Sequence, residues 1–143
     1  MNYQLGTGYN GTFDAGISLQ LLVNRMVSSS IDTATRNKTN VVNDVSRDIQ
    51  LMADKSKVVP LIDELLATVV ANSRNSEIHV NADCYRDIVI LNIQDRNNNN
   101  GYALDFSIMS LESQVRAAGG SLSIDGKQKR VATVSFSFPN LAA

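Results

Sequence analysis

Residues 54–95 read DKSKVVPLIDELLATVVANSRNSEIHVNADCYRDIVILNIQD, and this stretch decides the fold. Its first half places apolar residues at steps of three and four, which predicts one face of an α-helix. The residues on this face are Val58, Leu61, Ile62, Leu65, Leu66, Val69 and Val70. Asp54 or Ser56 is suited to cap the helix start, and Pro60 lies near enough to the first turn to be tolerated with a small kink.

Beyond Ser73 the apolar spacing changes from helical to alternating, which is typical of β-strands. The first alternating run covers residues 78–82, and the second covers residues 89–93 and ends on Asp95. The unit at the centre of the chain is therefore a helix, two strands and an acidic residue.

The flanking sequence repeats this alternation of helix and hairpin. The predicted elements are a helix over 16–34, a hairpin of strands 41–45 and 49–52, an asparagine-rich loop over 96–101, a helix over 103–118, and a terminal hairpin of strands 122–124 and 132–138. Each helix has one apolar stripe and each strand one apolar side, so two layers suffice. We expect an α/β two-layer sandwich: a mixed sheet of about five to six strands with three helices on one face.

The length and composition fit one domain. The chain has 143 residues, of which 43% are hydrophobic, and we expect a single domain over 16–143. Gly6, Gly8 and Gly11 spell G-x-G-x-x-G, but no buried strand precedes them and no acid follows at the required place. We therefore interpret residues 1–15 as a flexible or edge segment.

Charge and cysteine content exclude several classes of function. The formal net charge is -1, which gives no field to attract nucleic acid or an anionic membrane. The apolar runs are shorter than a membrane span and the N-terminus lacks signal-peptide features, so a cytoplasmic location is expected. Cys84 is the single cysteine and His79 the single histidine, so neither an internal disulfide nor a usual zinc site is expected.

The segment MADKSKVVPLIDELLATVV resembles the N box of the GHKL ATPase superfamily, in particular the ATP-binding (HATPase) domain of sensor histidine kinases. The resemblance covers about residues 16–139 and includes the G-G-x-L-x-I start of the terminal hairpin and the closing F-x-F-P. It implies the GHKL sandwich, a magnesium–ATP site and transfer of phosphate to a histidine.

The resemblance places Glu64 at the first N-box position, where the superfamily uses such a residue as a general base. A solvated helix glutamate is the simpler alternative. Thr68 stands where an asparagine of the family holds the magnesium of ATP, and its shorter, neutral side chain does not reproduce that geometry. Ala71 stands where a lysine is common.

Asp95 matches the family aspartate that reads adenine, and its parity with Val89, Leu91 and Ile93 directs it to the inner side of the sheet. A buried carboxylate needs a partner. An adenine amino group is one candidate, and the start of the asparagine run, which Asp95 would cap, is the other. The glycines that follow this aspartate in the family are replaced by residues 96–99.

Two further family features are missing. No glycine lies between Gly101 and Gly119, so the second glycine box and the ATP lid that cradle the phosphates are absent. His79 lies on the polar side of a predicted strand, where we expect it to face solvent and not to accept a phosphoryl group. We do not expect this chain alone to autophosphorylate.

The sequence thus favours a degenerate histidine-kinase-like domain that acts in two-component-type signalling by protein interaction, with weak or no ATP binding and no cofactor. The expected partner is a response regulator or a kinase bundle domain, and a second copy of the chain is a further candidate. The alternative is a divergent domain that binds ATP and Mg²⁺ through Asp95 and Glu64 and phosphorylates a histidine on another chain or domain. A purely structural oligomeric domain is the third hypothesis.

Overall fold

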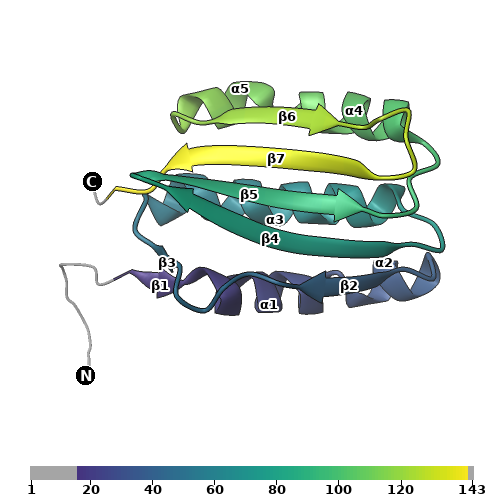
Figure 1. Ribbon diagram of the computed structural model, residues 1–143, viewed down its shortest axis with the longest axis horizontal. Coiled ribbons are helices and arrows are strands. Elements are labelled where there is room, and N and C mark those ends of the chain that lie inside the picture. The colour runs from purple at the N-terminus through teal and green to yellow at the C-terminus, as the bar shows by residue number, and fades with distance from the viewer. Residues whose placement is uncertain (1–15, 142–143) are drawn as a thin grey trace.

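The computed structural model describes residues 16–141, so the glycine motif and the segment predicted over residues 1–15 lie outside the described part of the chain. A sheet forms one layer and all the larger helices lie behind one of its faces (Figure 1). The elements in chain order are β1 (Ile17–Ser18), α1 (Leu19–Ser29), α2 (Ile31–Arg36), β2 (Asn40–Asn43), β3 (Gln50–Leu51), α3 (Lys55–Asn72), β4 (Glu77–Tyr85), β5 (Ile88–Asp95), α4 (Gly101–Met109), α5 (Glu112–Ala117), β6 (Ser121–Asp125) and β7 (Ala132–Pro139).

The main sheet has five strands in the order β2-β4-β5-β7-β6. The pair β2–β4 is parallel, and the other pairs are antiparallel. The predicted mixed sheet with helices on one face is therefore confirmed.

The predicted hairpin of strands 41–45 and 49–52 is wrong. β2 pairs in parallel with β4, whereas β3 pairs with β1 in a separate two-stranded sheet. The side chains of Val45 and Ile49 are buried, whereas residues 46–48 are exposed and the Ile49 backbone amide donates to the Ser46 carbonyl at 3.3 Å. The chain therefore turns between β2 and β3, but these two strands do not pair with each other. Parallel strands need a long crossover, and α3 supplies it between β2 and β4.

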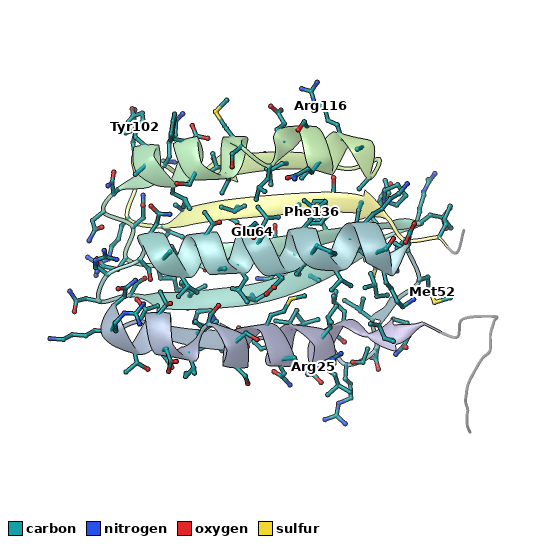
Figure 2. The ribbon with its side chains drawn as sticks, turned by 180° about the vertical axis from the view of Figure 1, so that it is seen from behind. Arg25, Met52, Glu64, Tyr102, Arg116 and Phe136 are labelled. Carbon is teal, nitrogen blue, oxygen red and sulfur yellow. The ribbon has the colours of Figure 1, made fainter. Side chains whose placement is uncertain are left out.

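Helix α3 forms the middle of the helix layer (Figure 2). The Asp54 carboxylate caps its start by accepting from the Ser56 amide at 3.0 Å, and the helix continues through Pro60. All seven residues of its predicted apolar stripe are buried. They join one core with the inner residues of the sheet, which include Val89, Leu91, Ile93, Val134, Phe136 and Phe138.

The other two predicted helices are each broken in two. The first splits at Ser30 into α1 and α2, and the third splits at Ser110 and Leu111 into α4 and α5. At both breaks a serine hydroxyl donates to a helix carbonyl: Ser29 to Arg25 and Ser110 to Ser107. Such side-chain bonds to the backbone compete with the regular helix ladder.

The outer face of the sheet, which the helices leave open, is lined by polar side chains that bond to one another across strands. Asn92 donates to the Asn81 side-chain oxygen at 3.1 Å, and Ser135 donates to the Asn92 oxygen at 2.7 Å. Ser121 and Ser137 are also hydrogen-bonded. These cross-strand hydrogen bonds therefore link β4, β5, β6 and β7 on the open face.

Within residues 16–141, no helix combines the length and the apolar character that crossing a membrane requires.

The burial of α3 leads to a stability prediction. Leu66 is 1% exposed, so Leu66→Ala should lower the free energy of unfolding by about 2–5 kcal/mol through lost burial and the cavity that remains. Urea denaturation followed by circular dichroism measures this change. Leu21→Ala on α1 is the matched control, because Leu21 is 61% exposed and should change stability by less than about 0.5 kcal/mol. Equal losses in the two variants would contradict the packing described here.

Candidate functional site

The strand registers bring four turns together at one end of the sheet. Asn40 pairs with Glu77, Ile78 with Asp95, and Asp95 with Ala132. We call this region the loop end; it comprises residues 37–40, 73–77, 95–101 and 125–132. The loop end contains Asp95, so the candidate site is described from this residue outward.

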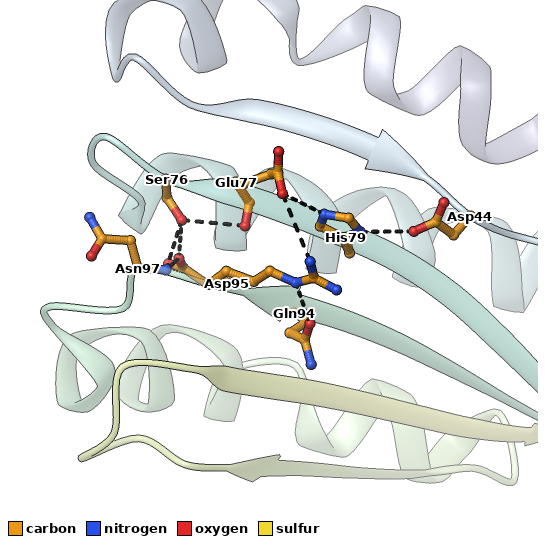
Figure 3. A network of polar contacts seen from close by, with 8 residues as sticks. Asp44, Ser76, Glu77, His79, Gln94, Asp95 and Asn97 are labelled. Carbon is orange, nitrogen blue, oxygen red and sulfur yellow. Dashed lines mark hydrogen bonds and ion pairs between the residues drawn. The ribbon is translucent and has the colours of Figure 1, made fainter.

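The Asp95 side chain is 3% exposed and lies on the inner side of the sheet, as its alternation with Ile93 predicts. Its carboxylate accepts a hydrogen bond from the Ser76 hydroxyl and another from the backbone N–H of Asn97, the latter at 3.0 Å (Figure 3). The Ser76 hydroxyl oxygen also accepts from the Asn97 amide at 3.1 Å. The buried charge therefore has partners within the chain, and it caps the start of the loop that follows.

Residues 96–100, here called the asparagine loop, tie the neighbouring turns together. The Asn97 side chain donates to the Asn75 carbonyl at 3.0 Å. The Asn98 side chain donates to the backbone carbonyls of Lys129 and Lys127 at 2.9 and 3.1 Å. The backbone N–H of Asn98 donates to the Arg130 carbonyl at 2.7 Å. Side-chain amides thus satisfy backbone carbonyls that turns leave unpaired.

The start of α4 is covered by the β6–β7 turn. Gly101 is buried, and a Cβ atom at this position would lie 1.9 Å from the Lys127 carbonyl oxygen, so only glycine fits. The Lys127 ammonium lies 2.9 Å from the carboxylate of Asp105, in the second turn of α4. This contact raises the pKa of Lys127 above its ordinary value. A backbone carbonyl oxygen of the β6–β7 turn therefore packs against the start of α4.

Glu64 and Thr68 lie one turn apart on α3. Glu64 is exposed and borders a groove of about 670 Å³ between α3 and α5, which Lys57 and Gln114 also line. Thr68 is half-buried, and its hydroxyl donates to the Glu64 carbonyl at 2.7 Å. Within residues 16–141, no hydrogen bond or ion pair joins either side chain to Asp95. Glu64 and Thr68 thus lie on α3, on the helix side of the sheet, and do not form one cluster with Asp95.

His79 lies on the outer face of the sheet, as predicted, but its side chain is only 14% exposed. Its Nδ1 atom lies 2.8 Å from Asp44 and its Nε2 atom lies 2.8 Å from Glu77 (Figure 3). Asp44 belongs to the segment after β2, which parallel pairing places beside β4. Hydrogen bonds that the imidazolium donates to the Glu77 carboxylate and, second, to the Asp44 carboxylate raise the pKa of His79 above its ordinary value.

The sequence reasoning missed Ser76 and Asn97 as partners of Asp95. Ser76 precedes Asp95 by 19 residues and reaches it only through the β4–β5 register. The available signal was the position of Ser76 immediately before β4, because β4 pairs with β5 and β5 ends at Asp95. In the described part of the chain, no group of three or more His, Cys, Asp or Glu side chains is placed to hold a metal ion.

No protein-family model matches the chain, and none of the curated proteins matches it. Solved structures do match. The histidine kinase AdeS of Acinetobacter baumannii is similar with a TM-score of 0.73 at 11% identity, over 87% of this chain and 66% of AdeS. The catalytic domain of the histidine kinase ThkA gives 0.66 at 12% identity, over 90% of this chain and 98% of that domain. This chain has the fold of a histidine kinase catalytic domain.

The histidine-kinase-type fold agrees with the GHKL sandwich expected from the N-box segment. Full-length ShkA in complex with AMPPNP also shares it, with a TM-score of 0.73 at 14% identity, over 90% of this chain and 31% of ShkA. A complex of ThkA with the response regulator protein TrrA contains it too, with a TM-score of 0.67 at 13% identity, over 88% of this chain and 41% of the matched chain. The chain therefore spans only part of several of these relatives.

The carboxylates around His79 lead to a prediction about pH. Because the folded pKa is raised, the imidazolium stabilises the fold fully below the unfolded pKa of about 6.5, and this stabilisation disappears as pH rises through the higher folded pKa. Replacing His79 with Gln should remove this part of the pH dependence of unfolding. NMR titration is unambiguous, since the chain has one histidine.

Asp44→Asn serves as the matched variant for this titration, because it removes one of the two charged acceptors and should lower the folded pKa of His79. A folded pKa at or below 6.5 in the unmodified chain would contradict the assignment.

Proposed function

We propose that this chain is a histidine-kinase-like domain of two-component-type signalling that acts by protein interaction, with weak or no ATP binding. The observation that carries the proposal is that the buried Asp95 carboxylate is hydrogen-bonded to residues of its own chain. Ser76 and Asn97 both donate to Oδ1 of this carboxylate, so the chain itself supplies the partners that a buried carboxylate needs and adenine is not required for that purpose.

Three neighbouring features support the same conclusion. The asparagine loop alone connects β5 to α4, which leaves no segment long enough for an ATP lid. The Lys127 carbonyl covers Gly101 at the start of α4, where amides would have to face a phosphate. The hydroxyl of Thr68, at the family's magnesium position, is bonded to a backbone carbonyl.

The proposed partner is a response regulator or a kinase bundle domain. The support is the complex of ThkA with the response regulator TrrA, which contains a domain of this fold. A homo-oligomer is a further arrangement within the same proposal. No cofactor is part of it.

A divergent ATP-binding domain that phosphorylates a histidine on another chain is the alternative, and one observation favours it. Asp95 is buried at the end of a central strand on the helix side, the position of the family's adenine aspartate. ShkA, which shares the fold, was crystallised with AMPPNP. In this alternative Glu64 would serve as the general base, with ATP and Mg²⁺ as the ligands.

Calorimetric titration with ATP and magnesium separates the two functions. We expect no saturable binding, or a Kd of about 1 mM or weaker, because Oδ1 of Asp95 is engaged within the chain and the Lys127 carbonyl covers the start of α4. The same titration of Asp95→Asn is the control. Micromolar binding that is lost in Asp95→Asn would contradict the proposal and support the ATP-dependent alternative.

A further inference from the structure

The loop end carries an unusual share of the positive charge of the chain. Of the 13 lysines and arginines, seven lie in or next to its four turns. They are Arg36, Lys38, Arg74, Arg96, Lys127, Lys129 and Arg130. A chain with a net charge of -1 thus has a basic end.

A depression of about 520 Å³ lies between these turns. Lys38, Arg96 and Arg130 line it, and each comes from a different turn. Glu77 is the one carboxylate in its lining. The walls therefore carry three cations against one anion.

Two of these three cationic side chains, those of Lys38 and Arg130, have no hydrogen-bonding or ionic partner within the described residues. Among residues 16–141, neither the Lys38 ammonium nor the Arg130 guanidinium forms an ion pair or hydrogen bond. Arg96 is partly occupied: its Nε atom donates to Gln94 at 2.7 Å, and its Nη1 atom lies 3.8 Å from the Glu77 carboxylate. The depression thus holds positive charge that the protein does not neutralise.

The walls are held in place by hydrogen bonds between the turns. Asn98 donates hydrogen bonds to the carbonyls of Lys127, Lys129 and Arg130 in the β6–β7 turn. The Asn97 side chain donates to the Asn75 carbonyl in the turn before β4. The amide of Asn75 in turn donates to the Asn37 carbonyl at 2.9 Å, next to Lys38. Because the backbone segments that carry the cations are already held together, less conformational entropy is lost when a ligand binds.

We propose that this depression binds the phosphate group of a small phosphate-bearing molecule. A guanidinium presents paired N–H donors that match two phosphate oxygens, and an ammonium adds a point charge. Asn40 and Asn75 line the same space and supply neutral side-chain amide donors. The open depression is large enough for a phosphate group, and a net charge of -1 gives the chain no overall field that would attract long polyanions.

This site differs from the nucleotide position that Asp95 marks. The Asp95 carboxylate lies beneath the depression, where it is bonded to Ser76 and Asn97 in the lining. A negative charge there repels an anion, so Asp95→Asn should leave phosphate binding unchanged or strengthen it. ATP binding through Asp95 should instead be lost in the same variant. The two ideas can therefore fail independently.

The test is an NMR and calorimetric titration of the 143-residue chain with inorganic pyrophosphate and with adenosine monophosphate, without magnesium. We expect saturable shifts confined to the loop end. Arg130→Gln and Lys38→Gln should each weaken binding about tenfold, since each removes a charged donor. Arg25→Gln on α1 is the matched control, because Arg25 is exposed and lies outside the depression. Thermal unfolding checks that the variants fold.

The two ligands distinguish the source of the phosphate. Tighter binding of adenosine monophosphate supports the proposal with a nucleotide as ligand, and equal binding supports it with the phosphate group alone as the recognised unit. No saturable binding of either ligand up to about 10 mM would overturn it. So would binding that Arg130→Gln and Lys38→Gln leave unchanged, or binding of a short RNA in place of the small ligands.

Discussion

The structure depends on covering one face of strand β5. This strand lies in the middle of the five-stranded sheet, and its inner residues Val89, Leu91 and Ile93 are each at most 1% exposed. Helix α3 supplies the largest apolar surface opposite them, and it also forms the crossover that allows β2 to pair in parallel with β4. Both the core and the meeting of the turns at one end follow from the placement of this helix.

The elements that bury the most apolar surface were predictable from the sequence. The stripe of α3 and the alternation in β4, β5 and β7 are repeated often enough to fix the element type and the inward face. The pairing of β2 was not predictable, because a parallel partner lies beyond a helix and leaves no local turn signal. The breaks at Ser30 and Ser110 were missed because the apolar spacing continues across them.

The same distinction applies to the candidate site. The inward direction of Asp95 follows from strand parity, whereas its bonds to Ser76 and Asn97 depend on a register between distant residues. His79 illustrates the limit of parity. It lies on the outer face as predicted, yet Asp44 and Glu77 on either side shield it from solvent. Side chains that approach from a neighbouring segment are invisible to an analysis of one strand.

The hydrogen bonds of Asn98 have a consequence for the order of folding. Its acceptors are the carbonyls of residues 127, 129 and 130, which lie about 30 positions later in the chain. These bonds of Asn98 therefore form only after the terminal hairpin has docked beside β5, since closure of a loop of about 30 residues must come first. In a growing chain, Asn97 can therefore bond to Asn75 and Asp95 before the acceptors of Asn98 have been synthesised.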